Sequence, residues 1–349
     1  MTNIKTYDGD VEKQRIHYLL QRAFQSANIN LLIGSGASYP AIKLVGNIEK
    51  EINDLLEADK EQEAKEKKCT FVQTIQTPTN QLIKDEKMDD NDKVKSYYTE
   101  LLNILMTILI KRKTKLLPIQ ATIFTTNYDL FIEKSFENLP FQSLRLNDGF
   151  GRFPSLKNKF EFSPENFFET TSSRGQLYDY KVEIPSINLI KLHGSMSWKR
   201  EEKIILYRVE PTDELPVTPS EDEQTTYLDQ FTVVLPQKHK FRETVLDRFY
   251  YDLLRTYANQ LDEKNTLLIV FGFSFTDEHI REITKRALKN PTLKIIIFAF
   301  DLDSALFFEN EFKKYNNVDI VQPADGATIG FEIFNTILKE SSGTSSNEM

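Results

Sequence analysis

The stretch that most constrains this chain is Ile29-Asn30-Leu31-Leu32-Ile33-Gly34-Ser35-Gly36-Ala37-Ser38. Its first half is a short apolar run, which is typical of a buried strand. Its second half places two glycines one residue apart among small residues. Where a strand runs into a glycine turn and then a helix, the backbone can approach a pyrophosphate and the first N–H groups of the helix can bind it. A plain strand-to-loop turn is the alternative, because Tyr39 stands where the dinucleotide fingerprint would have another small residue.

Short apolar runs and segments of helical periodicity alternate along the rest of the chain. This alternation predicts an α/β fold, in which a parallel sheet is covered by helices on both faces. We expect strands at residues 29–33, 121–125, 188–192, 232–235, 266–271, 294–300 and 318–321. We expect helices at residues 10–27, 41–58, 93–113, 128–137, 241–261, 277–289, 302–314 and 327–340.

Three segments interrupt the alternation and are interpreted as irregular or helical insertions. Residues 57–95 are first charged and then polar with poor periodicity, residues 140–186 are rich in Phe, Asn, Ser and Pro, and residues 199–231 are polar with an acidic loop. We expect one domain over residues 1–340 and a disordered Ser-rich tail at 341–349. The second insertion holds aromatic residues that could pack a subdomain core or build a subunit contact: Phe150, Phe153, Phe160, Phe162, Phe167 and Phe168.

Composition and charge exclude several classes of function. The 349 residues are 40% hydrophobic and carry a net charge of −8, which argues against broad binding to nucleic-acid phosphates. The single cysteine, Cys69, allows neither a disulfide within the chain nor a cysteine-rich zinc site. The polar N-terminus lacks the apolar core of a signal peptide, and the longest apolar run is too short to span a bilayer. We therefore expect a cytoplasmic protein that does not bind membranes.

Small or polar residues follow four of the expected strands. Ligands of an open parallel sheet bind at the carboxyl ends of its strands, so this coincidence predicts one shared site. Each motif also has a structural alternative, because Asn127, Thr126-x-x-Asp129 and Ser274-x-x-Asp277 fit helix caps and His193 could be a core histidine. The four segments are Gly34–Ser38, Thr125–Asp129, His193–Ser195 and Gly272–His279.

The ordered set GSGAS, TTNYD, LHGS and GFSF resembles the sirtuin-like NAD-binding family. Sirtuins carry a Gly-Ala-Gly-x-Ser turn, a Thr-Gln-Asn-x-Asp turn, a His-Gly pair and a Gly-x-Ser turn in this order. The chain departs from them at Ser35, where Ala is usual, and at Thr126, where Gln is usual. It also lacks the Pro-Asp-Phe-Arg run and the four zinc-binding cysteines of the deacylase members.

The longer spelling of these motifs looks like the bacterial sirtuin-like branch found in antiphage defence. That spelling includes Thr-Thr-Asn-Tyr-Asp, Leu-His-Gly-Ser-Met-Ser-Trp and Gly-Phe-Ser-Phe-Thr-Asp-Glu-His-Ile, with Asn147–Phe150 and Leu235-Pro236 before Lys240-Phe241. The resemblance covers about residues 20–340 and implies a Rossmann-like sheet with no zinc module.

The resemblance implies an NAD⁺ hydrolase that cleaves the bond between nicotinamide and ribose, with NAD as substrate and no metal. Asn127 and His193 would be catalytic: Asn127 would orient the ribose or a water, and His193 would act as general base, since histidine titrates near neutral pH. Asp129 would hold nicotinamide or fix Asn127. The other expected NAD-binding residues are Gly34, Ser35, Gly36, Ala37 and Ser38 in the first turn, Thr126 in the second, and Gly272 and Ser274 near the adenosine half.

Other functions of the same residues stay open. They are a protein deacylase or ADP-ribosyltransferase, and a non-catalytic sensor of NAD or ADP-ribose. The absence of a zinc module favours water as the acceptor. Because an uncontrolled NAD⁺ hydrolase would starve its own cell and about 340 ordered residues leave no room for a sensor domain, we expect control by a homo-oligomer or a second protein. The short form resembles the partner of a HerA-type translocase ATPase.

Overall fold

The computed structural model describes residues 2–43, 48–112, 117–139, 144–152, 159–174, 181–208, 210–235 and 248–343. Phe153, Pro236, Lys240, Phe241 and the tail from residue 344, which carried some of the expectations above, lie outside these ranges.

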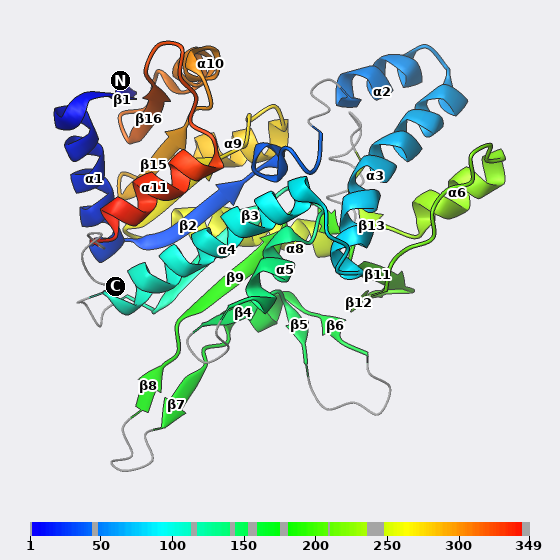
Figure 1. Cartoon of the computed structure of the whole chain (residues 1–349), viewed down its shortest axis with the longest axis horizontal. Helices are drawn as coiled ribbons and strands as arrows, with labels where there is room; N and C mark the ends of the chain where they lie inside the picture. The colour runs from blue at the N-terminus through cyan, green and yellow to red at the C-terminus, as the bar shows by residue number, and fades with distance from the viewer. Residues whose placement is uncertain are drawn as a thin grey trace.

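A parallel sheet of eight strands forms the centre of the described part of the molecule (Figure 1). Its six inner strands, in chain order, are β2, β3, β9, β14, β15 and β16. When these six strands are numbered in chain order, their order across the sheet is 3-2-1-4-5-6, which is the doubly wound order of a Rossmann-like fold. The expected fold class is therefore confirmed. From edge to edge the sheet runs β1 (Asn3–Tyr7), β16 (Val318–Pro323), β15 (Leu293–Phe298), β14 (Thr266–Phe271), β2 (Asn28–Ile33), β3 (Gln120–Thr125), β9 (Ser186–Lys191) and β4 (Arg145–Asn147).

Helices cover both faces of this sheet, which explains why its strands are apolar without alternation. In β2, Leu31 and Ile33 face a core shared with helices on one side, and Leu32 faces the core on the other side. The first side carries α1 (Gly9–Ser26), α4 (Asp89–Ile110) and α11 (Phe331–Ser341) (Figure 1). The second side carries α8 (Arg248–Asp262), α9 (Glu278–Ala287) and α10 (Leu302–Phe312).

The two edge strands of the sheet were not predicted. Strand β1 pairs with β16 from Asn3 opposite Asp319 to Tyr7 opposite Pro323, and β4 pairs with β9 over three residues. Both strands are polar and half-exposed or exposed along most of their length. An edge strand needs no apolar run, because one of its sides has no neighbour to pack against, so hydrophobic patterning missed both.

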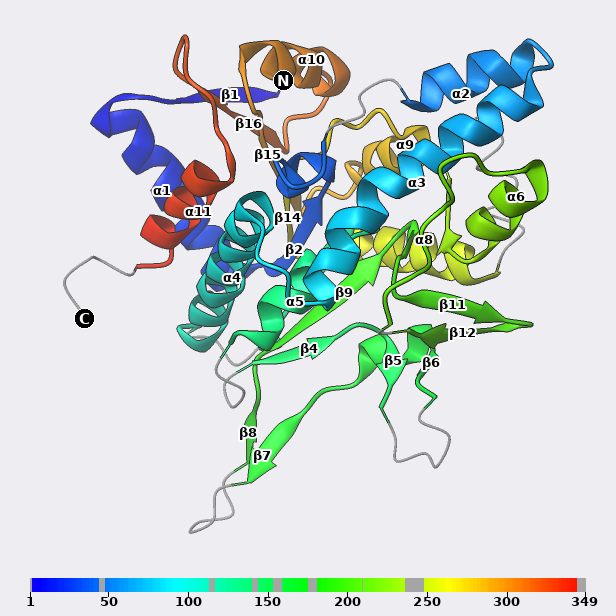
Figure 2. The same cartoon turned by 45° about the vertical axis from the view of Figure 1, so that its right-hand side comes forward.

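The first insertion is helical, which is one of the two alternatives expected for it, although residues 69–92 are polar and poorly periodic in sequence. Helix α2 (Ile48–Glu57) is followed by the long helix α3 (Glu61–Ile83), which packs against α6 (Glu221–Asp229) of the third insertion (Figure 2). The periodicity was hidden because the buried face of α3 is partly polar. Gln76 donates to the Thr212 hydroxyl and to the Asp213 carbonyl at 2.8 Å each, and accepts from the Tyr227 hydroxyl at 2.7 Å.

The second and third insertions together build a small sheet beside the large one. Its order is β11 (Trp198–Glu201), β12 (Ile204–Tyr207), β6 (Glu161–Phe162) and β5 (Phe150–Gly151). Two further pairs of strands are the projecting hairpin of β7 (Ser172–Arg174) with β8 (Lys181–Glu183), and β10 (Gly194–Ser195) with β13 (Thr232–Val233) (Figure 1). The remaining short elements are α5 (Phe131–Glu137) and the 3₁₀ helices η1 (Ser35–Ser38) and η2 (Pro164–Phe168).

The aromatic residues of the second insertion pack inward. Phe150, Phe162 and Phe167 are at most 5% exposed. Phe150 and Phe162 contact the indole of Trp198, Phe167 contacts Phe162, and Phe160 packs against the same core. Phe168 differs, with 73% of its surface exposed. The subdomain-core alternative thus applies to Phe150, Phe160, Phe162 and Phe167 but not to Phe168.

Candidate active site

The four motifs start at the same level of the sheet. The pairings of β14 with β2, β2 with β3 and β3 with β9 place Phe271, Ile33, Thr125 and Lys191 side by side. Each motif begins at one of these residues or within two positions after it, so all four emerge at one edge. The strand order reverses between β2 and β14, and in such sheets the crevice at this reversal is where ligands bind.

The glycines of the first and last motifs allow their two turns to pack against each other. A Cβ atom on Gly34 would lie 2.5 Å from the Gly272 carbonyl oxygen, and one on Gly36 would lie 2.9 Å from the Gly272 Cα. The Gly34 N–H donates to the Phe271 carbonyl at 3.1 Å, and the Gly36 N–H donates to the Gly272 carbonyl at 2.9 Å. Gly272 also has a φ of +64°, which favours glycine. These glycines therefore have a packing role, and two of the N–H groups expected to face a pyrophosphate are used inside the protein.

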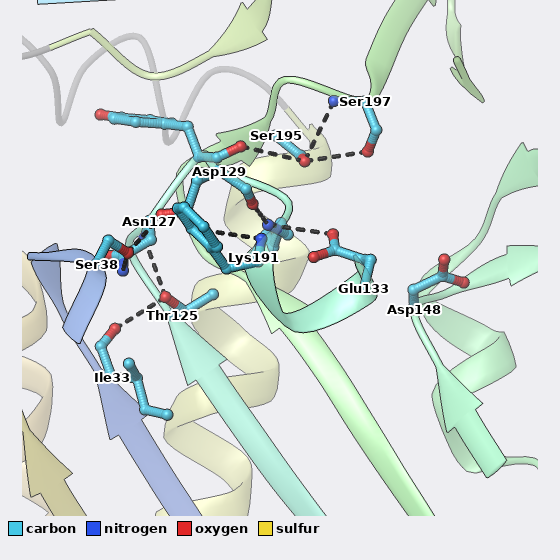
Figure 3. A network of polar contacts seen from close by, with 12 residues as sticks. Ile33, Ser38, Thr125, Asn127, Asp129, Glu133, Asp148, Lys191, Ser195 and Ser197 are labelled. Atoms are coloured by element: carbon cyan, nitrogen blue, oxygen red, sulfur yellow. Dashed lines mark hydrogen bonds and ion pairs between the residues drawn. The ribbon is translucent and has the colours of Figure 1, made fainter. Parts of the chain in front are cut away.

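Asn127 ties the second motif to the first (Figure 3). Its Nδ2 donates to the Gly34 carbonyl and to the Ser38 hydroxyl, at 3.0 Å each. Ser38 in turn donates to Asp129 Oδ2 at 2.7 Å. Because a carbonyl only accepts, Nδ2 must face Gly34, so the amide oxygen points elsewhere. Asn127, Ser38 and Asp129 are all buried, each with less than 8% of its residue surface exposed.

Tyr98 of α4 closes the buried side of this network. Its side chain is 1% exposed, and burial together with the negative charge of Asp129 holds the pKa of its hydroxyl well above the usual range. Thr125 completes the turn, since its hydroxyl donates to the Ile33 carbonyl at 2.9 Å and accepts from the Asn127 N–H at 3.0 Å. The turn that carries Asn127 is thus rigidly held by its own side chains.

His193 follows β9 and is held at three points. Its Nε2 lies 3.1 Å from Asp277 Oδ2, and its ring stacks on Tyr128 with centroids 6.4 Å apart. Its backbone carbonyl accepts from the Val234 N–H at 2.8 Å, and the Val234 carbonyl accepts from the Tyr128 hydroxyl at 2.7 Å. His193 is only 7% exposed, so its ring has one defined orientation.

A buried ion pair lies between the Asn127 and His193 turns. Lys191 Nζ is 3.2 Å from Glu133 Oε1 and also donates to the Asp129 carbonyl (Figure 3). Burial raises the pKa of the Glu133 carboxyl, and Lys191 partly opposes this rise. A small cavity adjoins the pair and is lined in part by Asp148, Ser197, Trp198 and Tyr207.

The structure brings most of the expected site residues to one edge, but not all face the same way. Ala37 is fully buried, whereas Ser35 and Ser274 are exposed, and the Ser274 hydroxyl lies 2.9 Å from that of Thr276. Thr126 is half-buried, and its N–H donates to the Ile33 carbonyl at 3.4 Å. Their roles in binding NAD stay predictions.

Sequence reasoning missed Asp277, Lys191, Glu133 and Tyr98 as parts of this site. Asp277 was interpreted as a helix cap, and it does cap α9 by accepting from the His279 and Ile280 N–H groups. Lys191 could have been identified from the sequence, because it is a charged residue at the end of an apolar strand. All residues of this strand, β9, are buried.

A family model described as "SIR2-like domain" matches residues 121–320, which is more than half of the 349-residue chain. The chain belongs to the SIR2-like family. SIR2-like domains bind NAD, and the family carries NAD-dependent enzyme activity. The match begins in β3 and includes the motifs of Asn127, His193 and Gly272, while Gly34–Ser38 lie before it. No curated protein matches the chain.

The sirtuin-like part of the resemblance is thereby confirmed, and two further observations bear on the site. Across the described ranges, His, Cys, Asp and Glu side chains form no cluster of three or more that could hold a metal ion. Among the helices that the structure describes, none is both long and apolar enough to cross a membrane.

Proposed function

We propose that this chain is an NAD⁺ hydrolase that releases nicotinamide and ADP-ribose, and that the activity serves antiphage defence. The observation that supports the chemistry most is the matched register of Asn127 and His193. Thr125 of β3 pairs with Lys191 of β9. Asn127 lies two positions after Thr125, and His193 lies two positions after Lys191. The imidazole of His193 and the carboxamide of Asn127 therefore emerge from neighbouring strands, beside the glycine turns.

The reaction needs a water that is held and deprotonated and a ribose that can carry developing positive charge. The Asn127 amide oxygen is suited to orient the water or a ribose hydroxyl, because Nδ2 is occupied by Gly34 and Ser38. His193 would take the proton of the water as its oxygen attacks the ribose C1′. The bond from C1′ to the nicotinamide nitrogen breaks, nicotinamide leaves with the electron pair, and the proton passes to solvent.

The residues present are compatible with NAD at the reversal of strand order, because the four motifs emerge together at this edge of the sheet. Gly34 and Gly272 support this site indirectly, since they allow the first and fourth motifs to pack against each other. Asp129, fixed by Ser38, would hold the nicotinamide side or keep Asn127 in place.

The test incubates the purified chain with NAD⁺, with and without an acylated peptide. Free ADP-ribose and nicotinamide formed without peptide support the hydrolase. Turnover that requires the peptide would instead indicate a deacylase or transferase, and binding of NAD without turnover would indicate a sensor.

His193→Ala and Asn127→Ala should each abolish NAD⁺ loss in this assay. His17→Gln is the matched control, because His17 lies on α1 outside all four motifs and is paired with Ser341 and Glu340 of α11. Circular dichroism and thermal melting must show that the variants fold. Wild-type turnover by a folded His193→Ala protein would contradict the mechanism.

We further propose, from the resemblance, that activity is controlled by assembly into a homo-oligomer and by a HerA-type ATPase partner. The projecting hairpin of β7 and β8 is consistent with contacts to another chain, since a two-stranded hairpin is marginally stable alone.

A further inference from the structure

We propose that Asp277 is a positioning residue that holds the His193 ring in the tautomer with its proton on Nε2, and so directs proton abstraction to Nδ1. This inference rests on the proposed function of His193 as general base. The resemblance assigned the catalytic step to Asn127 of the second motif and His193 of the third motif. The inference adds Asp277 of the fourth motif to that step.

The contact joins the two halves of the sheet. Asp277 follows β14 and His193 follows β9, and strands β2 and β3 lie between them. The 3.1 Å approach of Asp277 Oδ2 to His193 Nε2 therefore passes over the carboxyl ends of the two central strands. Both side chains are about nine-tenths buried, with 9% of His193 and 10% of Asp277 exposed, so water screens the pair weakly.

The carboxylate of Asp277 cannot turn away from this arrangement. Its other oxygen, Oδ1, accepts from the N–H groups of His279 at 3.0 Å and Ile280 at 3.2 Å, which caps the ten-residue helix α9. The positive end of the helix dipole favours the ionised carboxylate. An ionised carboxylate can only accept hydrogen bonds, so the proton in the contact must belong to His193 Nε2.

This assignment determines which atom of His193 can act as base. With the proton on Nε2, the imidazole lone pair is on Nδ1. Nδ1 would take the proton from water while the bond between C1′ and nicotinamide breaks, and the imidazolium formed would be stabilised by Asp277. Rotation of the ring is opposed by Tyr128 on its face and by the contact of Nε2 with Asp277.

Asp277→Asn provides a sharp test, because the two oxygens of Asp277 have different partners. The backbone N–H groups of His279 and Ile280 require an acceptor, so the carboxamide oxygen of the new side chain should stay on the helix cap. Its NH₂ group would then face His193 Nε2 and favour the opposite tautomer, with the proton on Nδ1. We expect kcat to fall by on the order of 10²- to 10⁴-fold with little change in KM.

Asp277→Ser is the matched control, since serine caps helices about as well as asparagine but does not present an NH₂ group to Nε2. The proposal predicts activity in the order wild type, then Asp277→Ser, then Asp277→Asn, with similar melting temperatures for the two variants. A purely structural role as cap predicts equal activity for both variants, and that outcome would overturn the proposal.

The tautomer is measured directly by nitrogen-15 NMR of imidazole-labelled protein, with the His193 signals identified as those lost in His193→Gln. We expect the protonated nitrogen to be Nε2 in the wild type and Nδ1 in Asp277→Asn. A wild-type ring protonated on Nδ1 would refute the assignment whatever the enzyme does. If the wild-type oligomer failed to cleave NAD⁺ both with and without a HerA-type ATPase, the hydrolase would be refuted and these spectra would still decide the pairing. If His193→Ala were inactive while Asp277→Asn kept full turnover, the hydrolase would stand and the positioning role would fail.

Discussion

Lys191 and Glu133 form a buried ion pair near the candidate site. Their side chains are 4% and 12% exposed, and Glu133 Oε2 has no hydrogen-bond partner among the described residues. Removing two charges from water costs several kcal/mol per ion, and the attraction between them offsets this cost only while both are present. The pair therefore stabilises the turns of Asn127 and His193 only while both charges are present. Substitution of either residue would leave the other charge buried and unpaired.

We predict that Lys191→Met or Glu133→Gln alone lowers the free energy of unfolding by about 3 to 5 kcal/mol. Each leaves a buried charge without its partner, and Lys191→Met also removes the donor to the Asp129 carbonyl. The double variant should lose less than the sum of the two, because it leaves no unpaired charge. Urea unfolding of all four proteins measures this coupling, and strictly additive losses would show that the two charges do not stabilise each other.

Single residues differed in how far their sequence context revealed their role. The positions of Asn127 and His193 at one edge of the sheet could be predicted because each follows an apolar run, whereas their catalytic roles stay predictions. The partner of His193 could not, since Asp277 satisfies a local rule as the cap of α9 and nothing local indicates a second contact from a distant strand. Tyr98 was equally hidden, because it belongs to an apolar helix face that only tertiary packing brings beside Asp129.

At the scale of elements, the close packing of two turns is the feature most sensitive to change. Gly34 has an extended backbone with φ −111°, so an added side chain would be disfavoured only by overlap with Gly272 and Phe273. Relief of that overlap requires backbone movement, because the nearest atoms are a carbonyl oxygen and a Cα.

We predict that Gly34→Ala lowers the free energy of unfolding by about 1 to 3 kcal/mol, as overpacking does elsewhere. Gly330→Ser is the matched control: a Cβ there meets nothing within 4 Å, φ is −79°, and serine suits the N-cap position that Gly330 holds before α11. The control should be as stable as the wild type or slightly more stable. Thermal melts that ranked the two variants in the opposite order would contradict the packing role assigned to Gly34.

Elements were predictable where apolar patterning alone decides them. The expected strands at 29–33, 121–125 and 266–271 agree with β2, β3 and β14 to within one residue. Helix α3 was missed because Gln76 and Asn80 lie on its buried face, where they bind Thr212 of a loop far along the chain. A buried polar face is invisible to a pattern that counts hydrophobic residues, and the partners that justify it are a property of the tertiary structure.

At the scale of the whole molecule, the sheet could be predicted but its strand order could not. Alternating apolar strands and helices require a parallel sheet covered on both faces, whereas several orders of strands satisfy that requirement. The reversal between β2 and β14 brings the first and fourth motifs together; their positions after strands predicted a shared site but not that these two strands are neighbours. Helix α3, which packs against α2, likewise also packs against α6 (Figure 2). Helices α3 and α6 belong to two insertions that are more than a hundred residues apart in the sequence.

The last prediction concerns assembly and follows from the proposed reaction. A chain that hydrolysed NAD⁺ without control would deplete its own cell, so we expect the purified protein to be a homo-oligomer whose isolated subunits turn over NAD⁺ slowly. The inward packing of Phe150, Phe162 and Phe167 removes those side chains as interface candidates, so the oligomer must use other surfaces.

Light scattering coupled to size-exclusion chromatography gives the mass, and dilution gives the link to activity. If only the assembled form is active, turnover per mole of chain should fall as the protein is diluted through the dissociation constant, because association obeys mass action. Turnover per mole that stayed constant from micromolar to nanomolar concentration, together with a monomeric mass, would refute control by self-assembly. Addition of a translocase-type ATPase would then be the remaining way to change the rate, and a rate unaffected by it would leave only expression level or access to NAD⁺ as safeguards.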